Sequence, residues 1–255
     1  MQADSTTSVP ATLSAAFVES WAAIVPGAPG EPAARLGDCA AEADIPAGLR
    51  RRLGPLARMG VACGLGVAPA SDADIVFCSR YGDISLAHQL LTALVGGEPM
   101  SPAGFSMSVH NTVPGVLDLA RKARIGHTAI AAGPQTLSAG LAEAWLRLGE
   151  RPHMKLVLVF ADLPLPGIYS QFADSDMGGI AFALRLSAGH GEGTAYCLTR
   201  DPAADGEGGP VLDAPPAERL ARELVVHMDD RVPQPLRWRS QGSLWSFGKS
   251  ADEAS

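Results

Sequence analysis

Residues 128–145, TAIAAGPQTLSAGLAEAW, place a run of small and apolar residues before a Gly-Pro pair and a segment with helical spacing. This pattern predicts a strand at 128–132, a sharp turn at 133–135 and a helix at 136–149. A turn from strand to helix is a frequent location for an enzyme's nucleophile, because the N-terminus of the helix stabilises developing negative charge. The turn here carries Gly133, Pro134 and Gln135, and none of these side chains is a nucleophile.

The segments around this turn alternate between apolar runs and amphipathic stretches. Strands are predicted at 74–79 and 155–162, and 179–187 with 194–200 are predicted to form a hairpin. Helices are predicted at 46–66, at 83–97 with Asp83 as N-cap, at 109–122 entered through Asn111, and at 216–228. Residues 12–24 fit either a strand or a short helix, 25–48 and 163–179 are expected to be loops, and the last residues an exposed tail. The alternation predicts a layered α/β fold with a mixed, largely parallel central sheet and helices on its faces.

Composition excludes several classes of function. The chain has 255 residues and a net charge of −7, which argues against nucleic acid as a partner, because binding phosphates requires a basic face. We expect no secretory signal and no membrane span, because the N-terminus lacks a basic region and no unbroken apolar run reaches 18 residues. The four cysteines show no C-x-x-C pair and predict reduced thiols in a cytoplasmic protein.

Four segments in sequence order resemble the N-terminal half of the β-ketoacyl synthases, which have the thiolase fold. These are FCSRYGDISLAHQLLTAL (77–94), SPAGFSMSVHNTVPGVLDLA (101–120), TAIAAGPQTLSAGLAEA (128–144) and VLVFADLPLP (157–166). Together with their flanks they cover residues 50–187. The resemblance implies a half-thiolase domain over residues 1–200, with residues 201–255 as a linker, an amphipathic helix and a C-terminal tail that pack on the same domain.

The chain departs from the family at the residues that perform catalysis. Counting from Asn111 without gaps places the family's catalytic cysteine at Pro134, and a shift of one residue places it at Gly133 or Gln135. The C-terminal half that brings the two catalytic histidines has no room, since only His227 follows the predicted hairpin. Without a thiolate and these histidines, the chain is not expected to be an enzyme on its own.

Family members without the nucleophile are known as chain-length factors. This chain resembles the short chain-length-factor-like subunits of aryl polyene and related type II fatty acid or polyketide synthases. The resemblance implies a heterodimer with a catalytic β-ketoacyl synthase, an acyl carrier protein as a further partner, and neither cofactor nor metal. It also implies that one stretch crosses the dimer axis and gates the acyl tunnel; its residues are Met107, Ser108, Val109, His110, Asn111 and Val113.

Other interpretations of single residues stay open. Arg50, Arg51 and Arg52 form either a solvated helix face or a weak docking point for the acidic carrier protein. Cys78 or Ser138 could serve a stand-alone acyltransferase or thioesterase, and a scaffold that only recruits carrier protein is a further alternative. Three aspartates lack a metal-ligand pattern and are expected to be solvated loop residues; they are Asp162, Asp174 and Asp176.

A half-fold also raises the question of what covers its helices. The apolar residues of the predicted helix 136–149 are Leu137, Leu141, Trp145 and Leu148. Either the C-terminal segment folds over them or a partner covers them, and an exposed apolar face of this size usually marks an interface. We expect the partner to use this face.

Overall fold

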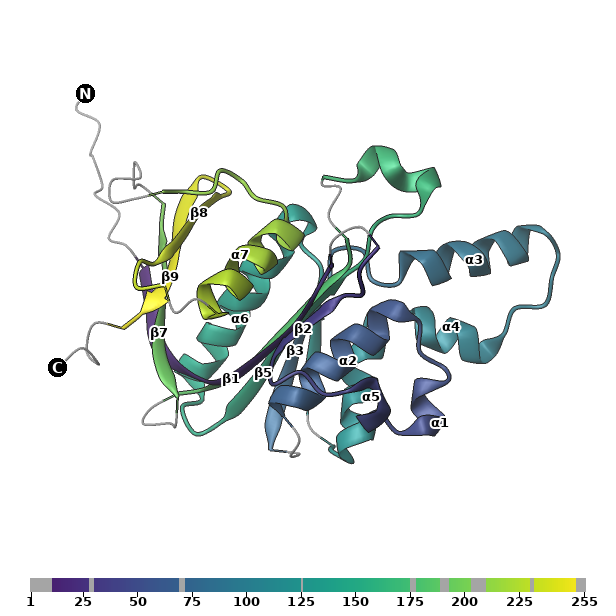
Figure 1. Cartoon of the computed structure of the whole chain (residues 1–255), viewed down its shortest axis with the longest axis horizontal. Helices are drawn as coiled ribbons and strands as arrows, with labels where there is room; N and C mark the ends of the chain where they lie inside the picture. Colours follow the sequence, from purple (N-terminus) through teal and green to yellow (C-terminus); the bar gives the residue numbers. More distant parts are fainter. Residues whose placement is uncertain are drawn as a thin grey trace, which may run out of the picture.

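The computed structural model describes residues 11–250, apart from 28–29, 69–71, 125, 175–177, 189–192, 203–209 and 230–231. A twisted mixed sheet forms the central layer, with α6 (Thr136–Glu150) and α7 (Ala217–Asp229) on one face and α2 (Pro55–Val67) and α5 (Thr112–Arg121) on the other (Figure 1). The layered α/β arrangement predicted from the sequence is confirmed.

The sheet has a parallel part and an antiparallel part. The strand order along it is β4-β3-β5-β6-β1-β7-β9-β8, with β2 paired to β1. Only β3 with β4 and β3 with β5 are parallel pairs among the named strands, so the parallel part is confined to one end. The strands are β1 (Ala11–Val25), β2 (Ala34–Gly37), β3 (Ala73–Cys78), β4 (His127–Ile130), β5 (Lys155–Asp162), β6 (Ile180–Ser187), β7 (Thr194–Asp201), β8 (Leu236–Ser240) and β9 (Ser243–Lys249).

The predicted hairpin between 179–187 and 194–200 is wrong, because β1 lies between its two strands. Strand β1 pairs with β7 through residues 11–18 and with β6 through residues 17–24. At 15 residues it is long enough to meet each neighbour with a different part of its length. The ambiguous segment 12–24 is therefore a central strand, and β6 and β7 are consecutive in sequence without being paired.

The C-terminal segment covers the apolar face of α6. Leu137, Leu141, Trp145 and Leu148 are all buried within the chain. The ring of Phe247 in β9 meets the Trp145 ring edge-on at 5.8 Å, and α7 packs beside α6. The expectation that a partner covers these residues was wrong, because α7 and the β8–β9 hairpin cover them within the same chain.

On the other face, α2 and α5 pack closely through glycines. A Cβ at Gly60 would lie 2.9 Å from Val113, and one at Gly64 would lie 2.6 Å from Leu117. The single helix predicted at 46–66 is broken into α1 (Ala47–Arg50) and α2. The break falls at Gly54-Pro55, because proline has no N–H to continue a helix and is favoured at its first position.

Two helices project from the sheet as an arm (Figure 1). These are α3 (Ile84–Val95) and α4 (Pro102–Ser108), and neither has a buried residue. Asp83 caps α3 as predicted, since its Oδ1 accepts a hydrogen bond of 3.0 Å from the Leu86 N–H. A 3₁₀ segment, η3 (Gly167–Phe172), lies within the predicted loop 163–179 and is bound to the base of the arm, because the Tyr81 hydroxyl donates to the Phe172 carbonyl at 3.0 Å.

The described residues contain no helix that is both long enough and apolar enough to cross a lipid bilayer.

Candidate functional site: the empty nucleophile turn and the projecting arm

The strand-to-helix turn forms as predicted. The short helix η2 (Gly133–Gln135) links β4 to α6, and Gly133 adopts a left-handed φ of 57°. The Thr136 hydroxyl directly follows the turn, but it is buried and already bonded. It donates to the Gly133 carbonyl at 2.7 Å and accepts from the Ala132 N–H at 2.9 Å. The turn therefore presents no free hydroxyl or thiol.

His110 lies beside this turn. Its Nε2 is 3.2 Å from the carbonyl oxygen of Ile130, the last residue of β4, and its ring packs 5.7 Å from that of Phe77. Gly82 contacts the other edge of the ring, since a Cβ there would lie 3.0 Å from His110 Nδ1. The histidine thus joins the stretch before α5 to the end of β4.

A buried carboxylate holds the adjacent turn at the end of β3. Asp162 accepts hydrogen bonds from the Ser79 hydroxyl at 2.7 Å and from the Arg80 N–H at 3.0 Å. Burial raises the pKa of Asp162 to about 7, although the bonds from Ser79 and Arg80 lower it and the charge of Glu218 raises it. The expectation that Asp162 is solvated was wrong, because it ends a strand inside the sheet. Asp174 is exposed as expected and pairs with Arg80, and Asp176 lies outside the described residues.

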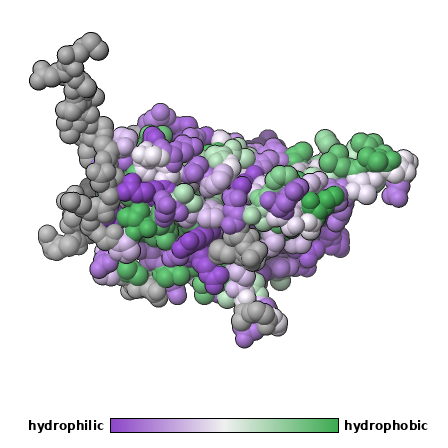
Figure 2. Space-filling model, turned by 90° about the horizontal axis from the view of Figure 1, so that it is seen from above, coloured by the Kyte–Doolittle hydropathy of each residue, from purple (hydrophilic) through white to green (hydrophobic). Residues whose placement is uncertain are grey.

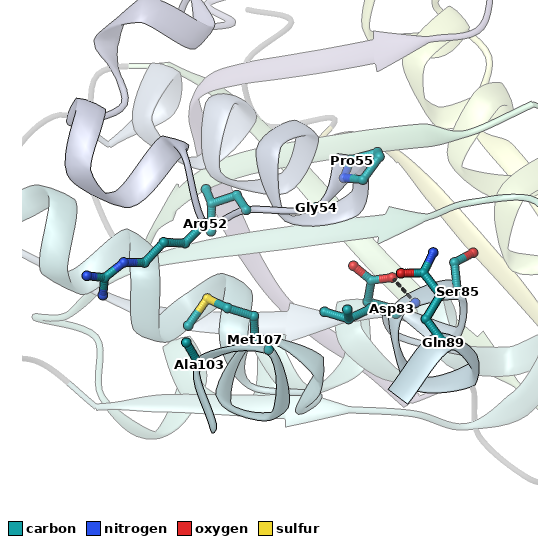
Figure 3. A pocket seen from close by; sticks show the side chains of 11 residues that line it. Arg52, Gly54, Pro55, Asp83, Ser85, Gln89, Ala103 and Met107 are labelled. Atoms are coloured by element: carbon teal, nitrogen blue, oxygen red, sulfur yellow. Dashed lines mark hydrogen bonds between the residues drawn. The ribbon is translucent and has the colours of Figure 1, made fainter. Parts of the chain in front are cut away.

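An open cavity of about 380 Å³ separates the arm from the body (Figure 3). Arg52, Gly54 and Pro55 line it from the body, Ser85 and Gln89 from α3 with its N-cap Asp83, and Ala103 and Met107 from α4. Met107 is the residue of the predicted gating stretch that reaches this cavity. Its flexible thioether can adapt to what enters.

The rest of the gating stretch divides between surface and core. Val109 and Asn111 are exposed, while Ser108 and His110 are half-buried. Val113 is only 1% exposed, and it packs in the core against α2. Its assignment to an interface was wrong, because the α5 face on which it lies is turned toward the sheet.

The three arginines do not form one uniform face. Arg50 is half-buried and its Nη1 donates to the Glu42 carbonyl at 3.0 Å. Arg51 and Arg52 are exposed, and only Arg52 reaches the cavity.

Neither of the two alternative nucleophiles, Cys78 and Ser138, is accessible to a substrate. Cys78 is fully buried, and desolvation raises the pKa of its thiol well above the usual value. Ser138 is also buried, and its hydroxyl accepts a hydrogen bond of 2.9 Å from the Trp238 indole. The described residues also contain no group of three or more side chains placed to bind a metal.

Exposed apolar side chains gather on the arm, as Figure 2 shows. Among the described residues, six of the eleven exposed large apolar side chains lie between positions 91 and 109. We call this set the arm surface: Leu91, Leu94, Val95, Met100, Phe105 and Val109. Except for Val109, the arm surface was not predicted, although ISLAHQLLTALV confines its polar side chains to one face and is apolar on the others. A helix of that kind is normally covered by other protein.

Residues 19–246 match the profile described as β-ketoacyl synthase, N-terminal domain. The chain belongs to this family. No curated protein matches the chain.

Three solved structures are similar to this family member. The first is a ketosynthase (ApeO) in complex with its chain length factor (ApeC) from Xenorhabdus doucetiae, with a TM-score of 0.69 and 25% identity over 91% of this chain and 99% of the other. The second is the ishigamide ketosynthase/chain length factor, with a TM-score of 0.64 and 11% identity over 92% and 99%. The third is a β-ketoacyl synthase from Burkholderia phymatum STM815, with a TM-score of 0.52 and 12% identity over 86% and 71%. The thiolase-like fold is thereby confirmed, and the first two alignments span nearly all of both chains.

Proposed function

We propose that this chain is a non-catalytic, chain-length-factor-like partner of a catalytic β-ketoacyl synthase. The observation that carries the proposal is the turn Gly133-Pro134-Gln135, which retains the strand-turn-helix geometry without a nucleophile. A condensing enzyme needs a thiolate at this place to accept the acyl group. The similarity to one chain of a ketosynthase–chain length factor complex supports the same conclusion. The alignment covers 91% of this chain and 99% of that one.

The arm surface and the edge of the sheet are the interface in this proposal. Strand β4 is an edge strand, so one side of its backbone is unpaired within the described sheet. Both unpaired strand edges and contiguous exposed apolar side chains are features that a partner covers. The synthase is the occupant we assign, because a relative that is 25% identical is found with its counterpart in a complex.

Met107, Ser108, Val109, His110 and Asn111 connect the arm to the empty turn and are proposed to shape the acyl tunnel of the synthase. Two observations support this role. Met107 lines the cavity at the base of the arm, and His110 contacts the end of β4 beside the turn. Val109 lies between them and is exposed, so it can reach a neighbouring subunit.

We propose that the complex works in an aryl polyene, fatty acid or polyketide biosynthetic pathway. An acyl carrier protein is its further partner. The exposed Arg51 and Arg52 are the proposed contacts to that acidic protein, in a chain that is otherwise net negative. Arg50 contributes less to this contact, because it is bound to the Glu42 carbonyl.

Intact-protein mass spectrometry tests whether the chain is catalytic. The purified chain and its co-purified complex with a partner β-ketoacyl synthase are each incubated with an acyl carrier thioester. The synthase should gain one acyl group per active site, and this chain should gain none. A stoichiometric acyl adduct on this chain, removed by Thr136→Val, Cys78→Ala or Ser138→Ala, would contradict the proposal and identify the nucleophile.

A further inference from the structure

Two cysteines far from the empty turn lie together where a loop crosses α2. Cys39 is half-buried and follows β2, whereas Cys63 is fully buried in the middle of α2. The two thiols interact, because Cys63 lowers the pKa of Cys39 and Cys39 raises the pKa of Cys63. Neither the interface nor the tunnel of the proposed function uses this pair.

The backbone brings the two residues close independently of their side chains. The Ala40 N–H donates to the Ala62 carbonyl at 3.3 Å, and these residues directly follow Cys39 and precede Cys63. The same loop lies tightly on α2, since a Cβ at Gly66 would lie 1.9 Å from the Asp38 carbonyl oxygen. A disulfide requires Cα atoms within about 7 Å, and the Ala40–Ala62 hydrogen bond joins the backbones directly beside the two cysteines.

A cation lies beside the outer sulfur. Arg35 Nη1 is 3.5 Å from Cys39 Sγ and donates to the Ala40 carbonyl at 2.7 Å. The neighbouring Cys63 side chain and the charge of Arg35 together lower the pKa of Cys39 to about 7, while burial raises the pKa of Cys63. Cys39 is therefore more easily deprotonated near neutral pH than an ordinary cysteine, whereas Cys63 remains a protonated thiol.

We propose that Cys39 and Cys63 form an oxidation-sensitive dithiol, in which Cys39 reacts with a hydroperoxide and Cys63 resolves the product into a disulfide. The Cys39 thiolate attacks one oxygen of the hydroperoxide, the O–O bond breaks, and Cys39 becomes a sulfenic acid while the other oxygen leaves as water or an alcohol. Cys63 then loses its proton and attacks the Cys39 sulfur, and the hydroxyl group leaves as water. The two thiols supply the two electrons that reduce the peroxide. The resulting bond fixes the Asp38–Ala40 loop to α2.

Peptide mapping after oxidation tests the proposal. The full-length chain is reduced, treated with a small excess of hydrogen peroxide at pH 7.5, alkylated and digested with trypsin. Peptide 36–50, which carries Cys39, should be linked to peptide 59–80, which carries Cys63 and Cys78. The link should persist in Cys78→Ala and Cys197→Ala and be lost in Cys39→Ser. In Cys63→Ala, Cys39 should instead be trapped by dimedone as the sulfenic acid. A Cys39 that stays fully alkylatable after peroxide, or that links only between molecules, would overturn the proposal.

The pH dependence of Cys39 alkylation tests whether its thiol is activated by its neighbours. The rate of Cys39 alkylation should reach half its maximum near pH 7 in the unmodified chain. Cys63→Ala and Arg35→Gln should each move this midpoint upward, because each removes a group that favours the thiolate. The role assigned to Cys39 would be contradicted if the unsubstituted chain had the alkylation midpoint of an ordinary cysteine. It would also be contradicted if neither substitution changed the midpoint.

Discussion

The Trp238 indole N–H donates a hydrogen bond of 2.9 Å to the Ser138 hydroxyl, which joins β8 to the first turn of the helix that follows the empty nucleophile turn. Both side chains are buried, and they are 100 residues apart in sequence. This bond fixes the C-terminal segment to α6. It also explains why Ser138 is a structural residue.

Removing the hydroxyl in Ser138→Ala should destabilise the chain. The Trp238 N–H would be left buried without a partner, which costs about 1–3 kcal/mol. Urea unfolding followed by tryptophan fluorescence measures the change, and Ser170→Ala on the exposed η3 segment serves as the control. Equal unfolding free energies for the two variants would show that the bond contributes nothing to stability.

Much of the local structure follows from the sequence, whereas the pairing of distant segments does not. β3, β5, α3, α5 and α6 form where apolar periodicity and the Asp83 cap predict them. The position of β1 depends on contacts with strands more than 150 residues away, which no local pattern encodes.

The expectation of an exposed C-terminal tail was wrong, because β8 and β9 form a buried hairpin there, and the sequence does contain a local signal for it. RWRSQGSLWSF alternates around Gln241 and Gly242, whose φ values of 50° and 70° are those that a type I′ turn requires. At the candidate site, the empty turn could be read from the sequence. The arm surface could not, because exposure is decided by how the helices are placed in three dimensions.

The buried carboxyl of Asp162 should make stability depend on pH. Burial raises its pKa in the folded chain to about 7 from the usual 3.8, so the folded state binds a proton that the unfolded state has lost between these values. Stability should therefore fall as pH rises from about 4 to about 7, by a few kcal/mol from this group. Asp162→Asn should remove that fall, whereas Asp229→Asn, at an exposed position, should keep it. Parallel unfolding curves for the wild type and Asp162→Asn across this range would refute the assignment.

Aspartate at Val113 and at Val109 should have different consequences. Val113 is 1% exposed, and an unpaired charge there should cost several kcal/mol and unfold the chain. Val109 is 39% exposed, so the Val109→Asp chain should keep its melting temperature and lose only its binding to the synthase. Circular dichroism and a pull-down with the synthase distinguish the two effects. A soluble, folded Val113→Asp chain would mean that this core is less tightly packed than its burial indicates.

Enlarging Val109 should shorten the product of the reconstituted pair, because a bulky ring at this position fills space near the neighbouring tunnel. Chromatography of the released acyl products from Val109→Trp measures the distribution. Val226→Trp, on α7 and also exposed, should leave the products unchanged. If Val109→Trp forms an intact complex with unchanged products, Val109 does not belong to the gating stretch.

Size-exclusion chromatography with light scattering of the co-expressed pair measures whether the arm surface binds a β-ketoacyl synthase. Leu94 on the arm and Leu146 on α6 form a matched pair, because their exposures are 54% and 51%. The wild-type chain and Leu146→Asp should both elute with the synthase at the mass of a complex with equal numbers of the two chains, whereas Leu94→Asp should elute alone. A wild-type chain that elutes as a monomer beside the synthase, or a Leu94→Asp chain that binds as well as Leu146→Asp, would contradict the account.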